Sequence, residues 1–485
     1  MPRRRAASGP AVVHRTARVE VRVSSGQRER CFGLLRSAGD VWAVLLQANR
    51  WRRERGAPGL VGYQELCREL AAAGPGVFGE LSTVGARSVL RRYSDAWFAA
   101  AARANAGAAR PGFPRRRRGL VPVRFYAGTF TLDGRRLRLP VAAGCAPLWL
   151  RLTRPVPYPP DTVRSVTLLH QGGRLFVEVT AELPVAVYPA GQEPDRQRVA
   201  GVDLGIIHPY AVATGAAATG ADPDGGAAGL LVSGRALRAE HRLHLSDTKR
   251  RSRAVAARAP ARGQRGSRRW KKTRARARTV EGRHARRISQ AQHEAADAVV
   301  AWAVQHRIGT LVVGDPRSLL QHDAGRRHNR AVRTWQVGGL IAKLTDKATL
   351  AGLQVHLVDE RGTSSTCPAC TSRVPKPRGR QFRCGQCGHH GHRDLVGAAN
   401  IAGRTPGGNQ RPPDLTGAPP THRRAGRHLP GAGPSRRDPR RTHLHTGRGS
   451  RGRPGPPWPA PPLGESLAST TDEDQTTPAH RANVA

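Results

Sequence analysis

Acidic residues are scarce in this sequence. Its 485 residues include 34 Asp and Glu against 81 Lys and Arg, which gives a formal net charge of +47. Arginine, alanine, glycine and proline abound, as in proteins encoded by GC-rich DNA, but such a bias does not explain the shortage of acids. A surface this basic attracts polyanions, because neutralising phosphates releases counterions. The charge balance therefore favours a nucleic-acid partner.

Long apolar segments are also missing. No apolar run approaches the ~20 residues that a membrane span needs, and Met1-Pro-Arg-Arg-Arg leads into no hydrophobic segment of a secretory signal. No basic amphipathic helix with a bulky apolar face stands out, which disfavours an anionic membrane surface. We therefore expect a cytoplasmic protein with no membrane partner.

Cysteines are few, and their spacing is uneven. The seven cysteines are an odd number, which argues against a disulfide framework. Cys31, Cys67 and Cys145 are isolated, so we expect them to be core or bystander thiols.

The other cysteines form two Cys-x-x-Cys pairs, which are Cys367 with Cys370 and Cys384 with Cys387. Each pair places two thiolates on one side of a tight turn, and two facing turns complete a tetrahedral shell around one structural Zn²⁺. Because four cysteines fill such a site, we expect the nearby His389, His390 and His392 to be polar surface residues.

The chain is long enough for two or three domains plus tails. We expect a basic arm and a first strand over residues 1–24, a helical unit over 25–112, and a small antiparallel β unit over 113–196. An α/β domain over 197–402 follows, with the zinc ribbon at 363–391. Residues 403–485 are rich in Pro, Gly and Arg and have few apolar clusters, so we expect a disordered tail.

Periodicity supports this division. Apolar residues recur at helical spacing from Leu34 to Leu46, and residues 163–170 and 174–183 alternate around Gln171-Gly-Gly173, which predicts a hairpin. Residues 125–132 and 135–139 flank Asp133-Gly134 in the same way. From residue 199, strands alternate with helices through short links, which indicates a layered α/β domain.

Two basic segments are candidate contacts for nucleic acid. One is a loop of four arginines and the other is the start of a basic helical region. Their residues are Arg115, Arg116, Arg117 and Arg118 in the loop, and Arg268, Arg269, Trp270, Lys271 and Lys272 in the helical region.

Four carboxylates lie at the ends of predicted elements. Asp203 follows the strand 199–202, Asp315 follows 311–313, Glu360 follows 354–358, and Asp394 opens a short helix over 395–401. Hydrolysis of phosphodiesters by two divalent cations needs acidic side chains that hold ions ~3.5–4 Å apart. These positions are therefore candidate ligands for two catalytic Mg²⁺ ions. Asp394 could alternatively be a helix N-cap.

Four segments follow one another in order: Gly201-Val-Asp-Leu-Gly205, the basic Gly266-Ser-Arg-Arg269, Thr363-Ser-Ser-Thr-Cys-Pro-Ala-Cys370 and His392-Arg-Asp-Leu-Val-Gly-Ala-Ala-Asn-Ile401. Together they resemble the TnpB family, the OrfB-type proteins of insertion sequences, which are related to type V CRISPR effectors. The resemblance spans roughly residues 15–402 and is most specific over 199–402.

This resemblance implies a transposon-associated, RNA-guided DNA endonuclease whose partners are a guide RNA and a target DNA. It implies a RuvC-like, RNase H-type α/β catalytic domain with an inserted zinc ribbon, a helical recognition unit and a β wedge unit. The first and third catalytic aspartates of the family fall on Asp203 and Asp394.

The second catalytic position departs from the common family pattern. Much of the family has Glu at the end of the middle strand, where this chain has Gly314. Asp315 comes next, but a shift of one residue on a strand points a side chain to the opposite face. Part of the family carries this carboxylate on the strand before the zinc ribbon, where Glu360 lies. We therefore favour Glu360 over Asp315, and a site weakened by Gly314 is the alternative.

Two other functions fit the same residues. Gly314 favours a guide-dependent DNA-binding protein that acts like a repressor and does not cleave. Asp203, Asp315 and Glu360 could instead form the Asp-Asp-Glu site of a strand-transfer transposase, although that function explains neither Asp394 nor the ribbon beside it. None of these functions fixes an oligomeric state.

Overall fold

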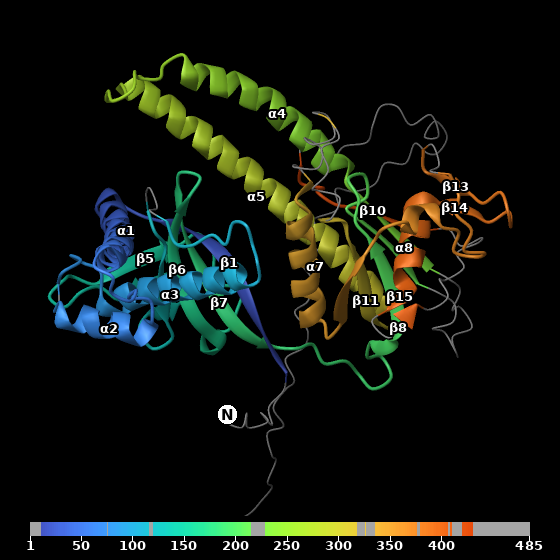
Figure 1. Ribbon diagram of the computed structural model, residues 1–485, viewed down its shortest axis with the longest axis horizontal. Coiled ribbons are helices and arrows are strands. Elements are labelled where there is room, and N and C mark those ends of the chain that lie inside the picture. Colours follow the sequence, from blue (N-terminus) through green and yellow to red (C-terminus); the bar gives the residue numbers. More distant parts are fainter. Residues whose placement is uncertain are drawn as a thin grey trace, which may run out of the picture.

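A computed structural model describes residues 11–74, 76–115, 120–214, 228–317, 325, 335–375, 379–405, 408–409 and 420–429. Arg116, Arg117 and Arg118 of the predicted basic loop lie outside these residues. The chain combines helices with a seven-stranded and a six-stranded sheet (Figure 1), which confirms the predicted mixed architecture. Among the described helices, none has the length and apolar character to cross a membrane.

The N-terminal unit is built on the seven-stranded sheet, in the order β2-β6-β7-β1-β5-β4-β3. Its strands are β1 (Val12–Arg22), β2 (Val123–Tyr126), β3 (Thr131–Asp133), β4 (Arg136–Leu139), β5 (Leu148–Leu152), β6 (Val163–Gln171) and β7 (Arg174–Pro184). Its helices are α1 (Ser25–Glu54), α2 (Tyr63–Ala72), α3 (Thr83–Asn105) and the short 3₁₀ turn η1 (Pro160–Thr162).

Local sequence explains how this unit begins. The Ser24 hydroxyl accepts from the Gln27 backbone N–H, and the Gln27 side chain accepts from the Ser24 N–H, which fixes the start of α1. The buried stripe from Leu34 to Leu45 on α1 then packs in one core with the sheet. In this core the ring of Trp42 on α1 contacts the ring of Tyr93 on α3 edge to face. β1 pairs with β7 from Val12 to Glu20, so the first strand of the unit pairs with a strand that comes much later in the chain.

The hairpin predicted over residues 163–183 is present as β6 and β7. The turn carries Gly172 and Gly173 at positive φ, where a side chain would be strained. The hairpin predicted over 125–139 is wrong in its first strand, because β2 and β3 are separate strands at opposite edges of the sheet. Alternation continues through both strands, and periodicity alone does not reveal that the chain crosses between edges.

The C-terminal unit is built on the six-stranded sheet, in the order β12-β11-β8-β9-β10-β17. The strands are β8 (Asp195–Asp203), β9 (Tyr210–Thr214), β10 (Ala228–Ser233), β11 (Ile308–Asp315), β12 (Gln354–Asp359) and β17 (Thr421–Arg424). The helices are α4 (Arg235–Ala256), α5 (Arg268–Gln305), α7 (Val337–Leu350) and α8 (Arg393–Ala402). Small elements are η4 (Thr363–Ser365), β13 (Gln381–Arg383), β14 (His390–His392), β15 (Arg404–Thr405) and β16 (Gly408–Asn409).

Strand alternation divides the two faces of the six-stranded sheet. Ala200 and Val202 of β8 belong to the core formed with α5 and α7, whereas Gly201 and Asp203 face α8 on the other side. β8, β11 and β12 run parallel, and β8, β9 and β10 run antiparallel. The carboxyl ends of β8, β11 and β12 therefore meet at one edge, beside the start of α8.

α4 and α5 form a long helical hairpin that extends away from the six-stranded sheet (Figure 1). The C-terminal half of α5 packs on the sheet through Ile288, Val299 and Trp302. Its N-terminal half contacts the β6–β7 turn, where a Cβ on Gly282 would lie 2.8 Å from the Cα of Gly172. The two units therefore touch through backbone at this point, and both glycines are needed.

The expected disordered tail is wrong for residues 420–429. β17 adds a parallel strand to β10, with Leu230 opposite Thr421, and Ala425 and Leu429 are buried in the core with α5. The Glu294 side chain accepts from the Gly426 N–H at 2.9 Å. A composition argument misses this segment because edge pairing and two buried side chains stabilise ten residues within a polar stretch. Residues 430–485 lie outside the described part.

Candidate active site and metal centre

Asp203 ends β8 directly beneath α8. A Cβ on Gly201 would lie 1.9 Å from the carbonyl oxygen of Ala398, and a Cβ on Gly397 would lie 2.8 Å from Asp203 Oδ2. Glycine at position 201 is needed for the helix backbone to approach the strand so closely, and glycine at position 397 leaves room for the Asp203 carboxylate. The Gly-Val-Asp motif therefore positions its aspartate against α8.

Asp394 lies in the first turn of α8, one helical turn before Gly397. Its backbone N–H donates to Nδ1 of His392, so the residue that caps this helix is the histidine. Its carboxylate lies 2.8 Å from His208 Nδ1, and Arg380 Nη1 donates to both carboxylate oxygens at 2.7 and 2.8 Å. The side chain of Asp394 is thus held in place by His208, from the turn after β8, and by Arg380, from the segment that carries the cysteines.

Glu360 follows β12 and fills the space beside Gly314. A Cβ on Gly314 would lie 3.1 Å from both Cβ and Oε2 of Glu360 and 2.7 Å from Ile401 Cδ1 of α8. The carboxylate of Glu360 therefore occupies the volume that a side chain at position 314 would take. This places it on the α8 face of the sheet, the face that also carries Asp203.

The turn that carries Glu360 is tied to α8. Thr363 donates to the Glu360 carbonyl from its N–H at 3.2 Å and from its hydroxyl at 2.9 Å. The buried Asn400 amide donates to the carbonyls of Thr363 and Thr366, each at 2.7 Å. Asn400 thus couples the position of Glu360 to the helix that carries Asp394.

Asp315 is engaged elsewhere. Both of its carboxylate oxygens accept from Arg317 Nε at 2.8 Å, and one also accepts from the Arg317 backbone N–H at 3.0 Å. This hydrogen bonding with Arg317 lowers the pKa of Asp315. The charges of Glu360 and Asp394 act on Asp203, and the charge of Asp315 acts on Glu360. Asp315 is therefore near the other carboxylates, but it differs from them in its pairing with Arg317.

Negative charges of neighbouring carboxylates act on Asp203 and on Glu360. Burial, with the charges of Glu360 and Asp394, raises the pKa of Asp203 to about 8. Burial, with the charges of Asp315 and Asp359, raises the pKa of Glu360 to about 7. Burial alone would raise the pKa of Asp394, but the His208 hydrogen bond and the Arg380 charge outweigh it and lower that pKa. Cations would relieve this repulsion.

One carboxylate oxygen has no partner in the described part of the chain. Glu360 Oε2 is buried and accepts no hydrogen bond there. An unsatisfied buried carboxylate oxygen is costly unless a donor or a cation occupies the site. Carboxylate oxygens are the ligands that Mg²⁺ and Mn²⁺ prefer, so the chemistry of these residues fits hard divalent ions.

Four cysteines form a second cluster. The Sγ atoms of Cys367 and Cys387 are 3.6 Å apart, as are those of Cys370 and Cys384, and all four ligand atoms lie within 4.8 Å of one another. Tetrahedral coordination at ~2.3 Å places thiolates about 3.8 Å apart, whereas a disulfide needs ~2.05 Å. The cluster can therefore bind one metal ion.

We predict that Cys384→Ser lowers the affinity for zinc at least ~100-fold, because the thiolate shell loses one of its four ligands. Zinc retained after dialysis against a chelator, measured by elemental analysis, checks this. Cys145→Ser, a change at an isolated cysteine, is the matched control and should keep one zinc per chain. Equal zinc content in both variants would contradict a four-cysteine site.

The histidines near the cysteines only partly fit the expectation of surface residues. His390 is exposed, but His389 is buried at 5% exposure and lies near Phe382. His392 is half-buried, and with His208 and Asp394 it forms a second group of ligand atoms within 4.8 Å. Spacing from the cysteines could not reveal this, because His392 turns toward a residue of a distant strand connection.

Sequence reasoning missed three residues that hold the carboxylates in place, which are His208, Arg380 and Asn400. Asn400 lies inside the motif His392–Ile401, three residues after Gly397, and therefore on the same side of α8 as this glycine. His208 and Arg380 contact Asp394 across 186 and 14 residues, and no local pattern marks them.

The basic residues fall in different places. Arg268, Arg269, Lys271 and Lys272 are exposed at the outer end of the α4–α5 hairpin, at the start of α5. Trp270 is half-buried, with the Arg274 guanidinium 5.0 Å from its ring centroid. Arg115 accepts a hydrogen bond at its carbonyl from Trp42 Nε1 at 2.9 Å. These positions leave the charges of the hairpin free to meet a polyanion.

We predict that Arg380→Gln destabilises the protein at pH 7 by about 1–3 kcal/mol, because Asp394 stays buried without its guanidinium partner. The folded-state pKa of Asp394 lies below its ordinary value of 3.8, so the pair stabilises the fold above that pH. The stabilisation is lost as the pH falls through the pKa that Asp394 has in the folded protein. Urea unfolding between pH 3 and 7 checks this. Arg383→Gln, an exposed neighbour, is the control, and a deficit independent of pH would contradict the assignment.

Two family models match this chain. A model described as "Probable transposase", OrfB_IS605, matches residues 179–320, and a model described as "Cas12f1-like, TNB domain" matches residues 338–401. No curated protein matches the sequence.

Solved structures add a likeness of fold. The protein of a Cas12f1–sgRNA–target DNA complex superposes with a TM-score of 0.57 at 11% identity, over 82% of this chain and 99% of that one. The mini-RNA-guided endonuclease CRISPR-Cas_phi3 has a TM-score of 0.40 at 12% identity, over 81% of this chain and 92% of that one. The first likeness establishes a shared fold.

Residues 179–320 thus resemble the OrfB_IS605 family, and residues 338–401 resemble the TNB domain of Cas12f1-like proteins. The resemblance to the TnpB family that the sequence motifs carry is confirmed.

Proposed function

We propose that this protein is a transposon-associated, RNA-guided DNA endonuclease with a RuvC-like catalytic domain. Two observations carry the proposal: Asp203 and Glu360 both lie on the α8 face of the six-stranded sheet, and the charges of Glu360 and Asp394 both act on Asp203. The family resemblance supplies the reaction class, and the solved complex of similar fold contains guide RNA and target DNA.

The sheet supports an RNase H-type domain. Three antiparallel strands, β8 to β10, lead into the parallel strands β11 and β12 on the other side of β8. Helices cover one face and α8 the other. A mixed sheet of this order places the ends of the first strand and of the parallel strands beside the C-terminal helix, where a catalytic group can form.

Asp203, Glu360 and Asp394 would hold two Mg²⁺ ions. Such ions would supply a water of lowered pKa and positive charge for the leaving 3′ oxygen of the cleaved phosphodiester. Asp203 and Glu360, whose pKa values are raised without cations, would be ionised as ligands. Arg380 keeps Asp394 oriented and ionised. The half-buried position of the group limits bulk water.

The cysteine cluster would bind one structural Zn²⁺, which would hold the ribbon in place beside α8. The ribbon strand β13 directly follows Arg380, and the Arg393 N–H at the start of α8 donates to the Arg380 carbonyl at 2.8 Å. A closed four-cysteine site leaves no coordination position for substrate. Zinc would therefore support the geometry of Asp394 without taking part in the chemistry.

The basic α4–α5 hairpin would bind the backbone of the guide RNA or of the RNA–DNA duplex. Such a duplex is recognised through its shape and phosphates. We assign the same role to the loop around Arg115.

Purification from cells tests this function most simply. We expect a discrete RNA to copurify, and we expect the loaded protein to cleave plasmid DNA that matches this RNA in Mg²⁺ but not in EDTA. Sequencing the bound RNA supplies the matched target, and a scrambled target is the control. If no discrete RNA is bound, or if matched DNA stays intact in Mg²⁺, the proposal is wrong.

Gly314 favours one alternative, a guide-dependent DNA-binding protein without cleavage. The carboxylate of Glu360 in the space beside Gly314 weighs against it. An Asp-Asp-Glu transposase would need Asp315 in the metal site, and its pairing with Arg317 weighs against that.

A further inference from the structure

A cavity of about 660 Å³ lies between the base of the α4–α5 hairpin, the start of α7 and the turn after β8. Its size falls within the ~300–1,000 Å³ of sites that bind small molecules. Apolar and ring surfaces form most of the wall, including Leu237, Leu245, His241 and Trp335. The cavity can therefore accept a flat, partly apolar group.

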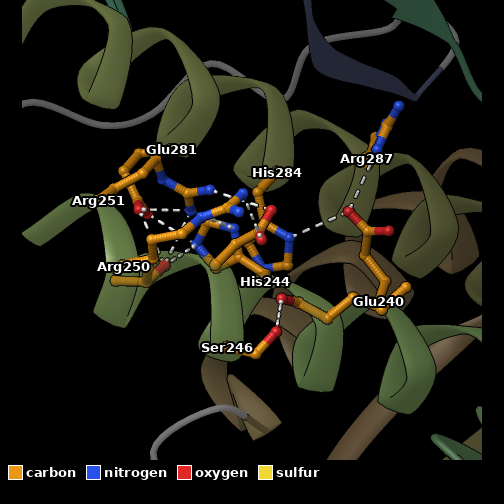
Figure 2. A network of polar contacts seen from close by, with 11 residues as sticks. Glu240, His244, Ser246, Arg250, Arg251, Glu281, His284 and Arg287 are labelled. Atoms are coloured by element: carbon orange, nitrogen blue, oxygen red, sulfur yellow. Dashed lines mark hydrogen bonds and ion pairs between the residues drawn. The ribbon is translucent and has the colours of Figure 1, made fainter. Parts of the chain in front are cut away.

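A network of polar contacts holds two walls of this cavity together (Figure 2). The rings of His244 and His284 stack with centroids 3.7 Å apart and an angle of 1° between them. His244 Nε2 lies 2.8 Å from Glu281 Oε2, and His284 Nδ1 lies 3.2 Å from Glu240 Oε1. These contacts join α4 to α5 and so fix two walls of the cavity relative to each other.

Two donors in the wall have no acceptor. Arg238 Nε and Trp335 Nε1 are buried, and neither donates a hydrogen bond to any of the described residues. Such orphaned donors indicate a ligand that supplies acceptor oxygens or nitrogens.

Positive charge gathers at the same place. Arg238 and Arg242 both line the cavity, and no described acid forms an ion pair with either. Burial, together with the charges of Arg242, Arg380 and Arg235, lowers the pKa of Arg238. Concentrated guanidinium charge without a counter-ion suits a phosphate group.

The cavity adjoins the proposed catalytic group. Pro209 lines the cavity, and the preceding residue, His208, contacts Asp394 at 2.8 Å. Arg380, which also contacts Asp394, is close enough to Arg238 to act on its charge. The turn after β8 and Arg380 therefore link the cavity to the site where we place phosphodiester cleavage.

We propose that this cavity binds one nucleotide of the substrate DNA strand, unstacked from its neighbours, next to the phosphodiester that is cleaved. The phosphate contacts Arg238 and Arg242, and the base lies among the imidazole, indole and leucine side chains. A nuclease that acts on a displaced strand needs such a contact to fix the strand relative to its metals. The inference rests on the proposed nuclease function.

Binding of thymidine 3′,5′-bisphosphate to the full-length protein in EDTA tests the proposal, with isothermal titration calorimetry as the readout. This probe carries a base and phosphates, and it binds without catalytic metal. We expect Arg238→Gln and the cavity-filling Leu245→Trp each to weaken binding by roughly tenfold or more, because one removes a charged contact and the other fills the space for the base.

Matched controls lie on the same helix. Arg250 pairs with Asp247 and Leu243 is exposed, and neither lines the cavity. Arg250→Gln and Leu243→Trp should bind the probe within about twofold of the wild type, because a distant charge contributes little. Equal losses in the control and cavity variants would overturn the proposal, as would a wild-type protein that does not bind the probe.

Two competitors separate a nucleotide site from an anion site. Inorganic phosphate alone and thymidine alone should each compete at least ~10-fold less well than the bisphosphate, since each makes only part of the contacts. Phosphate that competes equally well would overturn the nucleotide assignment. Asp203→Asn should leave probe binding unchanged. A protein that binds the probe but never cleaves DNA would therefore refute the nuclease and not the cavity.

Discussion

Asp203→Asn should reduce Mg²⁺-dependent DNA cleavage by at least ~1,000-fold, because the loss of a ligand between two metal ions removes most of the transition-state stabilisation they supply. Asp203 lies at the centre of the candidate site. The charges of both Glu360 and Asp394 act on it, and it lies directly beneath Gly397 of α8. Asparagine keeps the size of the side chain and removes the charge. Cleavage of matched plasmid, followed over time on gels, measures the change.

The rest of the protein should tolerate Asp203→Asn. The pKa of Asp203 is raised to about 8, so without metal its charged form opposes folding, and asparagine should not destabilise the metal-free protein. Bound RNA and zinc content should match the wild type. Asp195→Asn, at the opposite end of β8, is the control. Wild-type cleavage by Asp203→Asn would exclude a RuvC-like site.

Glu360→Gln should reduce cleavage by roughly 100- to 1,000-fold, since it removes the carboxylate that completes the metal site. The position of Glu360 depends on Gly314, whose missing side chain leaves the space that Oε2 occupies. Gln keeps nearly the same shape, so the turn held by Thr363 should persist. The cleavage rate in saturating Mg²⁺ measures the effect.

Asp315→Asn is the matched control for Glu360→Gln. Its carboxylate pairs with Arg317, so its loss should change cleavage less than about threefold, as for most partly exposed ion pairs. In addition, Gly314→Glu should recover part of the activity lost in Glu360→Ala, because it returns a carboxylate to the common family position. If Asp315→Asn abolishes cleavage and Glu360→Gln does not, the assignment of the second carboxylate is reversed.

Local patterns in the sequence predict much of this site. The spacing of the cysteines predicts a metal cluster because two tight turns fix the directions of four thiolates. Asp203 and Glu360 can be identified as candidate metal ligands because each follows an apolar run that ends at a glycine or at a turn. Parallel strands bring such ends to one edge of a sheet, so strand order and chain position already suggest that they meet.

Such local patterns do not predict the contacts between distant segments of the chain. Glu360 could be preferred over Asp315 by alternation, but only tertiary packing shows that the space beside Gly314 is filled by Glu360. His208 and Arg380 reach Asp394 through a turn and a ribbon that bear no shared motif. β17 was missed because its stability comes from the edge of β10 and not from its own composition.

The metal site that we propose at Asp203, Glu360 and Asp394 can be examined directly with Mn²⁺, which takes the oxygen ligands that Mg²⁺ prefers. Crystals of the protein soaked in Mn²⁺ and measured at the manganese absorption edge would locate the ions by anomalous scattering. We expect anomalous density among these three carboxylates, with Glu360 as a direct ligand. Manganese bound to Asp315, or none among the three carboxylates, would contradict the two-metal site.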